Sequence, residues 1–432
     1  MSKNIRKEKR SIFEKISDYI MKLATPLAKF AQLKPIAAIQ DGLVASMPVI
    51  IIGSLFLVIA LLGTDQILGN GRILIPALTG LVQPLTSAFS MTLGFVGFYV
   101  AYTIAHSYAE KLGGLDLKQA GLIGLLSFFF LTFAGPTEGS ISVQYFGSSG
   151  IFVAIISSLA TIKVYKFFVD KNIVIKLPKS VPPNVGNAFT TLIPMLAIIV
   201  ITWVIRTIIG FNLAEFLAVG LTPAIQAADS LGVYIFIMFI TMLFWAIGLN
   251  GPAILGAITT PIMTTSVANN AAAKLAGEVL PNIWTQTFSF SYMWVASVWP
   301  ILILLFLSKN KGNKAIGIAS APALVFNIIE PVMFGLPVAF NGFLMAPFVI
   351  TGTLGTGIAY FLTSIGFIGR PFAEFPWATP PFLSGILSTG DWKVLIVQAF
   401  IFVLGLAIYL PFFKLYEKNE AIEINQEETT LN

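Results

Sequence analysis

One carboxylate interrupts an apolar stretch in the second half of the chain. Glu330 stands directly before Pro331 in the run FNIIEPVMFGLPVAFN, residues 326–341. A carboxylate at mid-membrane costs on the order of 2.5–3.5 kcal/mol on insertion scales, so it usually faces a bundle interior or a transport pathway. Pro331 lacks a backbone N–H, and we therefore expect Glu330 at a helix break. If the preceding turn is helical, Asn327 lies on the same side, and the two side chains would offer hydrogen bonds to a hydroxyl-rich ligand.

Alternative interpretations remain open for the residues that attract attention by their type. Glu330 either holds a ligand or pairs with a buried cation, for which Arg206 and Arg370 are the candidates. Trp377 lies in a proline-rich break and suits either an interfacial anchor or stacking against the C–H face of a sugar ring. His106, at the edge of an apolar segment, is interpreted as a structural histidine rather than as a ligand.

The composition is that of a membrane protein. Of the 432 residues, 56% are hydrophobic and only 11% are charged, whereas a soluble domain carries roughly a quarter charged residues. Several windows approach the ~20 apolar residues that cross a bilayer. They run unbroken instead of alternating apolar and polar residues, which excludes an outer-membrane barrel. The sequence predicts an all-α polytopic membrane protein.

The residue types that are absent narrow the chemistry. There is no cysteine and a single histidine, so disulfides, thiolate metal sites, cysteine nucleophiles and histidine metal clusters are all excluded. A Walker loop, a GxSxG motif and paired carboxylates at catalytic spacing are also missing. We therefore expect no metal, no cofactor and no self-contained catalytic centre.

Charge and composition divide the chain. Five of the first ten residues are Lys or Arg, which places the N-terminus in the cytoplasm and makes the net charge of +6 a topology signal rather than a nucleic-acid-binding face. We expect a cytoplasmic tail with an amphipathic helix over 1–34, a transmembrane half over 35–170, a connector over 171–187, a second transmembrane half over 188–415 and a disordered acidic tail over 416–432.

Some segments do not divide cleanly into spans. Residues 73–111 contain either two short spans or one span plus a half-helix, and 212–231 is predicted to be a second interfacial amphipathic helix. Hydropathy gives about ten transmembrane helices.

Three stretches of the second half are broken by Gly and Pro, namely 246–263, 326–341 and 367–387. Backbone freed in this way inside a bilayer must be buried in protein or line a watery cavity. Discontinuous helices at mid-membrane are where transporters commonly place their substrate sites. The simpler alternative is a set of proline-kinked spans with no ligand.

At these residues the chain resembles a known family. FNIIEPVMFGLPVAFN is similar to the signature N-x-N-E-P followed by F-G-L-P of the membrane subunit, enzyme IIC, of bacterial sugar phosphotransferase systems of the lactose/cellobiose/diacetylchitobiose group. The resemblance extends over nearly the whole chain and includes LKPIAAIQDGLVASMPVIIIGS, SVPPNVGNAFTTLIP and PWATPPFLSGIL.

The resemblance implies ten transmembrane helices with re-entrant hairpins, a first half that forms a homodimer and a mobile second half that binds the sugar. Glu330 would hydrogen-bond the hydroxyl to be phosphorylated and assist as a base, and Trp377 would pack on the sugar. The backbone and side chains around Gly186 and Asn187 would close the site.

Two positions depart from the family pattern. Asn250-Gly251 stands where the family usually has His-Gly, and Ile329 stands where it usually has a second Asn. The amide of Asn250 still offers hydrogen bonds to a sugar but does not titrate near neutral pH. Ile329 removes a donor and an acceptor.

In this family the phosphoryl group reaches the sugar from a cysteine on a soluble B subunit, and the B subunit receives it from an A subunit. The absence of cysteine from this chain agrees with that arrangement. We therefore expect a permease in the bacterial cytoplasmic membrane, surrounded by lipid and with both termini in the cytoplasm, that binds a cellobiose-, chitobiose- or lactose-like sugar. The alternatives are a secondary transporter or facilitator of the same fold without phosphoryl coupling, and a sensor or scaffold subunit.

Overall fold

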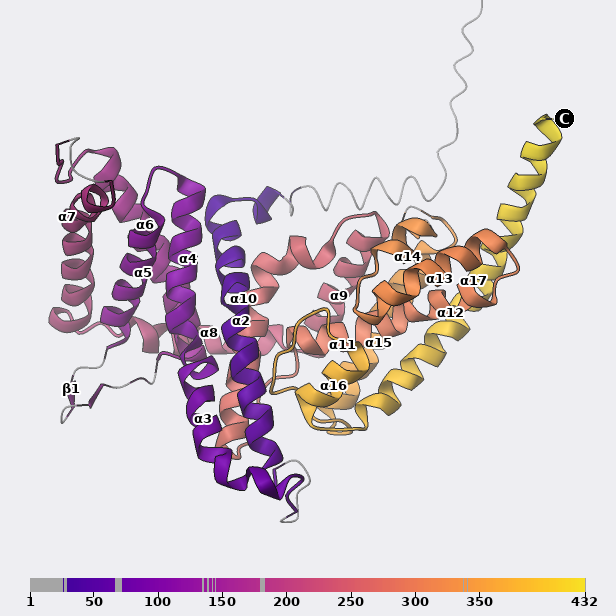
Figure 1. Cartoon of the computed structure of the whole chain (residues 1–432), viewed down its shortest axis with the longest axis horizontal. Coiled ribbons are helices and arrows are strands. Elements are labelled where there is room, and N and C mark those ends of the chain that lie inside the picture. The colour runs from indigo at the N-terminus through magenta and orange to yellow at the C-terminus, as the bar shows by residue number, and fades with distance from the viewer. Residues whose placement is uncertain are drawn as a thin grey trace, which may run out of the picture.

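The chain forms a two-part bundle of helices in the computed structural model (Figure 1). The helices of the first half lie on the left of this view and those of the second half on the right, with α2 and α10 between them. The amphipathic helix expected over 1–34 lies mostly outside the described residues. The structure describes residues 26, 29–66, 72–133, 136–137, 140–141, 143, 145–178, 183–336, 338–339 and 341–431.

Small residues let the helices of the first half approach closely. A Cβ atom on Gly42 of α2 would lie 2.6 Å from Ile104 Cα of α4, and one on Gly124 of α5 would lie 2.3 Å from Ala105 Cβ. Close backbone approach of this kind is how transmembrane helices gain packing energy without a hydrophobic driving force. The elements are α2 (Lys34–Leu62), η1 (Pro76–Leu81), α3 (Val82–Met91), η2 (Leu93–Phe95), α4 (Val96–Leu112), α5 (Leu117–Thr132), β1 (Pro136–Thr137), β2 (Ser140–Ile141), η3 (Ser148–Gly150) and α6 (Ile151–Asp170).

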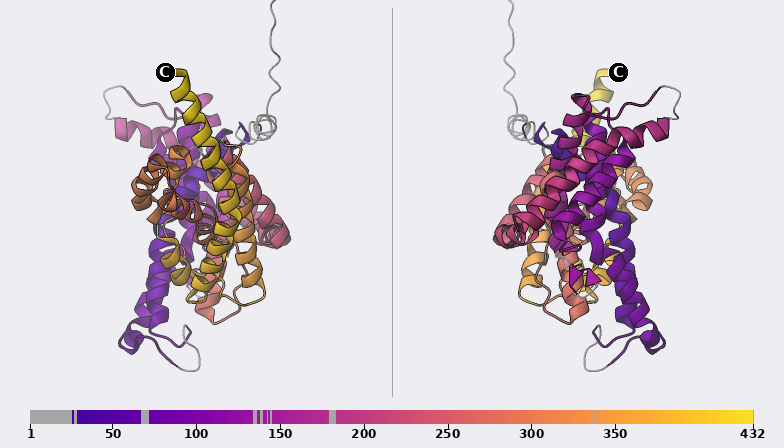
Figure 2. Two further views of the ribbon diagram at one scale, coloured as in Figure 1. Left: turned by 90° about the vertical axis from the view of Figure 1, so that its right-hand side faces the viewer. Right: turned by 90° about the vertical axis from the view of Figure 1, so that its left-hand side faces the viewer.

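The ambiguous segment 73–111 is a single span with an extension. Residues Pro76–Leu112 form one helical segment of 37 residues, bent at Thr92 between α3 and η2. At 1.5 Å per residue it is ~55 Å long, which exceeds the ~30 Å hydrocarbon core. The paired ends of α2 and α3 accordingly project beyond the other helices (Figures 1 and 2).

The chain then continues through α7 (Pro183–Trp203), η4 (Val204–Ile208) and α8 (Leu213–Ala228). We expected the second half to begin at residue 188, but α7 packs on α5 and α6 of the first half. The helix expected over 212–231 is confirmed as α8, whose N-cap Asn212 accepts a hydrogen bond from Glu215 N at 3.2 Å.

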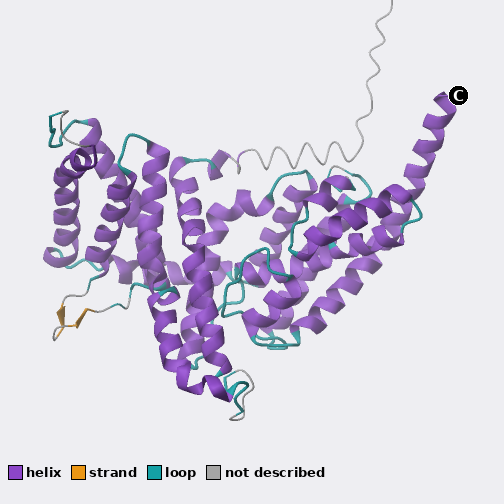
Figure 3. Ribbon diagram, viewed as in Figure 1, coloured by secondary structure: helices purple, strands orange, loops and turns teal. Residues whose placement is uncertain are grey.

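The second half is built around the largest hydrophobic core, in which α15 packs on α9, α11 and α17. Figure 3 shows that loop segments lie between these helices and not only at their ends. This follows from the Gly and Pro residues that break the apolar runs. The elements are α9 (Leu231–Ala246), α10 (Gly251–Ala276), α11 (Gln286–Ser297), α12 (Trp299–Leu307), α13 (Lys311–Val325), α14 (Glu330–Gly335), α15 (Met345–Ser364), α16 (Pro381–Thr389) and α17 (Val394–Leu431).

The prediction of an all-α polytopic membrane protein is confirmed. Seven helical segments of the described chain are long and apolar enough to cross a bilayer, and α5 and α9 are shorter apolar helices. The predicted total of about ten remains a prediction.

The acidic tail is not disordered as we expected, because α17 continues as a helix to Leu431. Two of its carboxylates explain how the extension is held. Glu417 accepts a hydrogen bond from Ser308, and Glu420 accepts one from Asn313 Nδ2 at 2.9 Å. These bonds tie α17 to the loop before α13 and to the first turn of α13.

Candidate functional site

Four of the predicted site residues line one cavity of about 270 Å³, although they come from three separate parts of the sequence. They are Asn250, Asn327, Glu330 and Trp377. The volume is close to the lower end of the roughly 300–1,000 Å³ typical of small-molecule pockets. The remaining lining residues are Trp245, Pro252, Phe290, Trp294 and Ile329.

The helix break before Glu330 is confirmed. Helix α13 ends at Val325 and α14 begins at Glu330, with Asn327 in the left-handed region at φ 60°. Asn is one of the few residues other than Gly that adopt this conformation readily. The assumption of a helical turn between Asn327 and Glu330 is wrong, but both side chains still border the same cavity.

Asn327 holds the loop that carries Trp377. Its Nδ2 donates to Trp377 O at 2.8 Å and to Thr379 O at 2.9 Å. The residue is 3% exposed, and within the described chain its Oδ1 has no hydrogen-bond partner. A buried acceptor without a partner is costly, so a ligand donor that reached Oδ1 from the cavity would satisfy it.

Asn250 is the N-cap of α10 as well as a lining residue. Its Oδ1 accepts a hydrogen bond from Ala253 N at 3.0 Å, which leaves the Nδ2 donors for another partner. Gly251 allows this position, because a Cβ atom there would lie 2.4 Å from Thr241 O of α9.

Two buried indoles complete the wall, and our sequence analysis missed them. The rings of Trp245 and Trp294 meet edge to face, 5.9 Å apart at 86°. They are 5% and 2% exposed, and neither Nε1 has a hydrogen-bond partner among the described residues. A buried Trp N–H usually finds a partner. Trp245 directly precedes the broken segment 246–263, which was the one signal available in the sequence.

Glu330 does not pair with either predicted cation. Arg206 Nε donates to Phe133 O at 2.9 Å, and Arg370 Nη1 donates to Leu280 O at 2.6 Å. Across the described residues no ion pair includes Glu330, whose side chain is exposed at the cavity. The interpretation that Glu330 forms a buried ion pair is therefore wrong within the described residues.

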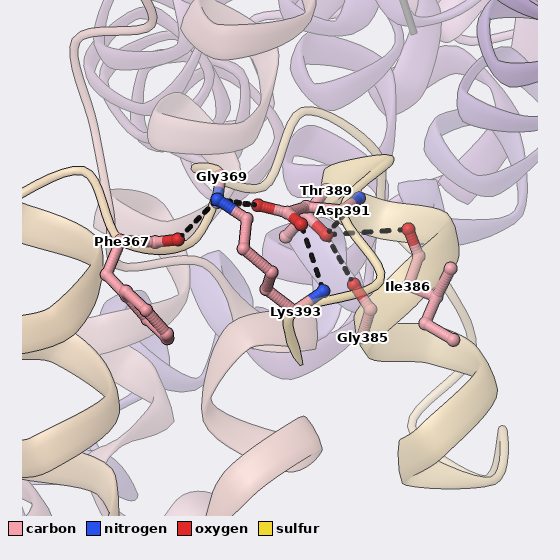
Figure 4. A network of polar contacts seen from close by, with 7 residues as sticks. All are labelled: Phe367, Gly369, Gly385, Ile386, Thr389, Asp391 and Lys393. Atoms are coloured by element: carbon pink, nitrogen blue, oxygen red, sulfur yellow. Dashed lines mark hydrogen bonds and ion pairs between the residues drawn. The ribbon is translucent and has the colours of Figure 1, made fainter. Parts of the chain in front are cut away.

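Trp377 is 47% exposed and belongs to the long loop between α15 and α16. The base of this loop is held by a polar network (Figure 4). Asp391 accepts hydrogen bonds from Gly369 N and from Lys393 N, each at 3.0 Å, and Lys393 Nζ donates to Phe367 O at 2.6 Å. The loop is thus fixed at its start by this network and near its end by Asn327.

Gly186 lies apart from the cavity. Gly186 is in the first turn of α7 and is not among the lining residues, and the side chain of Asn187 is outside the described part. Their role at the site stays a prediction. His106 stacks on Tyr102 with ring centroids 6.2 Å apart, as a structural histidine would.

The cavity combines apolar faces with a few hydrogen-bonding groups. The indole N–H groups and the Asn250 amide are donors, whereas Asn327 Oδ1 and the Glu330 carboxylate are acceptors. Among the described residues no group of three or more His, Cys, Asp or Glu side chains is placed to hold a metal. By contrast, the hollow of about 430 Å³ between α9 and α15 is lined almost entirely by apolar side chains. The polar cavity is therefore suited to a neutral ligand rich in hydroxyl groups.

Comparison with known families decides the identity. The model of the family "Phosphotransferase system, EIIC" matches residues 40–352. The chain belongs to this family. The match includes the FNIIEPVMFGLPVAFN run and three of the four cavity residues that the sequence predicted, with Trp377 beyond its end.

Relatives within the EIIC family cover most of the chain. The lichenan permease IIC component of Bacillus subtilis is 32% identical over 96% of both chains. The lactose-specific EIICB component of Streptococcus mutans is 30% identical over 88% of this chain and 69% of its own length. The crystal structure of ChbC, the IIC component of an N,N'-diacetylchitobiose-specific phosphotransferase system, superposes with a TM-score of 0.84 at 29% identity, covering 94% of this chain and 99% of that one.

Proposed function

We propose that this EIIC chain is the permease of a phosphoenolpyruvate-dependent phosphotransferase system for a β-linked disaccharide of the cellobiose, chitobiose or lactose type. The cavity around Glu330 carries the proposal, because its lining residues include a carboxylate, the Asn327 Oδ1 and two indole N–H groups that have no protein partner within the described part of the chain. The names of the relatives, which mention lichenan, lactose and diacetylchitobiose, support this sugar class.

The donor and acceptor inventory favours a neutral sugar over an ion. Each sugar hydroxyl both donates and accepts, so it can satisfy an indole N–H and a carboxylate at once. The aromatic face of Trp377 packs against the C–H face of a pyranose ring. Discrimination among disaccharides then depends on groups such as Asn250 and Ile329, which replace the family's usual His and Asn.

Glu330 acts on the hydroxyl that receives the phosphoryl group. That oxygen attacks the phosphorus of a phosphocysteine on the B subunit, the S–P bond breaks as the O–P bond forms, and the thiolate leaves. The hydroxyl proton passes to the carboxylate of Glu330, which acts as a general base. This chain supplies the sugar site and the path, while the B subunit supplies the phosphoryl group.

The partners and the location follow from this role. The S. mutans relative carries an EIICB name and extends beyond the region shared with this chain, which supports a B subunit as the partner. An A subunit would transfer a new phosphoryl group to the B subunit. We place the chain in the bacterial cytoplasmic membrane as a homodimer with both termini in the cytoplasm, so that the second half moves against the first and exposes the cavity to each side in turn.

The decisive experiment is the uptake of radiolabelled glucosides, galactosides and N-acetylglucosamine dimers into cells that express this chain, with and without the soluble phosphotransferase proteins. We expect one β-linked disaccharide to accumulate as its phosphate, and only when the partners are present. Free sugar that accumulates or equilibrates without them would instead favour a secondary transporter or facilitator. Binding without uptake would favour a sensor.

A further inference from the structure

The loop that carries Trp377 also contains a second carboxylate that the cavity does not use. Glu374 lies three residues before Trp377, is 3% exposed and is absent from the cavity wall. Within the described chain no ion pair includes it. A carboxylate buried this deeply is retained only where hydrogen bonds compensate for the loss of water.

The compensating bonds come from the start of α11. Glu374 Oε1 accepts a hydrogen bond from Thr287 N at 2.9 Å and another from Thr287 Oγ1. Thr287 Oγ1 in turn accepts one from Phe375 N at 2.9 Å. The first N–H groups of a helix lack intrahelical partners, so Glu374 satisfies one of them and fixes the loop to the helix.

This attachment bears directly on the cavity. Phe290 and Trp294 of α11 line it, and they follow Thr287 by three and seven residues, which places all three on one face of the helix. Trp377 lines the cavity from the loop. Glu374 therefore sets the position of one wall relative to the other.

The backbone of the same residue reaches the first half of the molecule. Glu374 N donates to Ser54 Oγ of α2 at 2.8 Å, and Ser54 is fully buried. The neighbouring side chains of Phe372 and Phe375 belong to the hydrophobic core that contains residues of α2 and α4. We call the contact between α2 and the second half the seam. Within a few residues the chain thus passes from this seam to the wall of the cavity.

Two further hydrogen bonds cross this seam. Gln40 Nε2 of α2 donates to Ala253 O of α10 at 3.1 Å, and Lys274 Nζ of α10 donates to Gln66 O at 3.1 Å. Neither one connects to a wall of the cavity through a buried side chain. The Ser54–Glu374–Thr287 chain does, because it joins α2, the Trp377 loop and α11 in sequence.

We propose that Glu374 is a positioning residue that couples the sugar cavity to the seam between the two halves. The inference rests on the proposed sugar-transport function. The Glu374–Thr287 bonds hold the cavity walls in register, and the Ser54 bond ties that assembly to α2. Movement of the second half against α2 breaks the Ser54 bond, so the state of the seam and the shape of the cavity change together. The seam and the cavity both favour one or the other of the same two arrangements. A change at the seam therefore alters sugar binding, and sugar binding alters the seam.

The Thr287 side of the chain is tested by sugar binding, with cellobiose, lactose and diacetylchitobiose as probes. Tryptophan fluorescence or calorimetry on the purified full chain gives the dissociation constant. We expect Thr287→Val, which keeps the shape but loses the hydroxyl, to raise it at least fivefold. Thr287→Ser restores the hydroxyl and should stay within twofold of wild type. Equal affinities for Val and Ser would overturn the positioning role.

The Ser54 side is tested by access to the cavity. The chain has no cysteine, so Trp377→Cys provides a single reporter for a membrane-impermeant maleimide, because Trp377 lines the cavity and is 47% exposed. We expect Ser54→Ala in this background to change the ratio of labelling from the two sides of a vesicle at least threefold. Ser46→Ala is the matched control, because Ser46 is equally buried on α2 and its Oγ bonds only to Leu43 O of its own helix, at 2.7 Å.

The outcomes separate the two proposals. If the wild-type chain binds none of the disaccharides, the proposed function fails. If wild type binds one of them and Ser54→Ala labels like Ser46→Ala, the function stands and the coupling through Ser54 fails. Should Thr287→Val not fold, Glu374→Ala provides the second measurement, because it removes the Oε1 atom that accepts both Thr287 bonds. An unchanged dissociation constant in Glu374→Ala would then contradict the inference.

Discussion

Two glutamates in the broken segments of the second half occupy opposite environments. Glu330 starts α14 at the edge of the cavity, is exposed and forms no ion pair within the described residues. Glu374 is 3% exposed and is held by the first turn of α11 through Thr287, while its backbone bonds to Ser54. The residue type is the same, but only the first carboxylate is left available to a ligand.

The difference teaches how a carboxylate at membrane depth is used. A carboxylate that accepts hydrogen bonds from protein donors gains a structural role and is no longer free to bind a ligand. A carboxylate without such donors keeps its acceptor oxygens for a ligand. Substitutions at the two positions should therefore affect different measurements. Substitution of Glu330 should change the rate of sugar phosphorylation. Substitution of Glu374 should change the stability of the protein and the coupling between the cavity and the seam.

The largest expected effect is that of Glu330→Gln on phosphorylation. Without the carboxylate no general base accepts the hydroxyl proton, and such a loss typically lowers a rate by about 10²–10⁴-fold. The amide still offers hydrogen bonds, so some sugar binding should remain. The measurement is the rate of sugar phosphate formation with purified A and B subunits. Glu278→Gln, at an exposed position just beyond the end of α10, is the control, and wild-type turnover in Glu330→Gln would remove the proposed role.

The second prediction compares the stability of Glu374→Ala with that of Glu330→Ala. Removing Glu374 leaves Thr287 N and Oγ1 without their buried acceptor, which should cost ~2 kcal/mol of unfolding free energy. Glu330→Ala should change it by less than ~0.5 kcal/mol, as for other exposed positions. Thermal unfolding in one detergent measures both. Equal destabilisation would mean that the two carboxylates are both structural.

Trp377→Ala should weaken disaccharide binding by ~1–3 kcal/mol, because a large apolar surface packed on the sugar is lost. The control is Trp392→Ala, since Trp392 is 65% exposed and lies outside the cavity. Calorimetric titration with the preferred sugar measures both variants. If Trp377→Ala binds as tightly as Trp392→Ala, Trp377 is an interfacial anchor instead.

The smallest effect concerns the two helix N-caps Asn250 and Asn212. Each Oδ1 accepts a hydrogen bond from the residue three positions on, so Asn250→Ala and Asn212→Ala should each cost ~1 kcal/mol of stability. Only Asn250 borders the cavity, so only Asn250→Ala should also weaken sugar binding. Equal affinity in the two variants would restrict Asn250 to its capping role.

The sequence by itself determined the class of the protein and the parts of the site that depend on local chemistry. Long apolar runs indicate helices that cross a membrane, and Gly and Pro mark where those helices break. A carboxylate in such a break is costly enough to attract attention, and for this reason Glu330 was predicted, with Asn327 beside it, whereas Asn250 was predicted from the family resemblance. The tail was predicted wrongly, since its composition does not reveal that Ser308 and Asn313 bond to it.

Only the tertiary structure decided which distant segments meet. Hydropathy is a property of neighbouring residues, and nothing local distinguishes Ser54 or Glu374 from other small or acidic residues of the chain. Their contact joins positions 320 residues apart, and it exists because α2 packs beside the second half. Packing within the second half, where α9 and α11 both lie against α15, brings Trp245 and Trp294 together at the cavity wall. Glu330 and Asn327 could thus be predicted from residue types, whereas the two indoles and the coupling to the first half depend on how the helices pack.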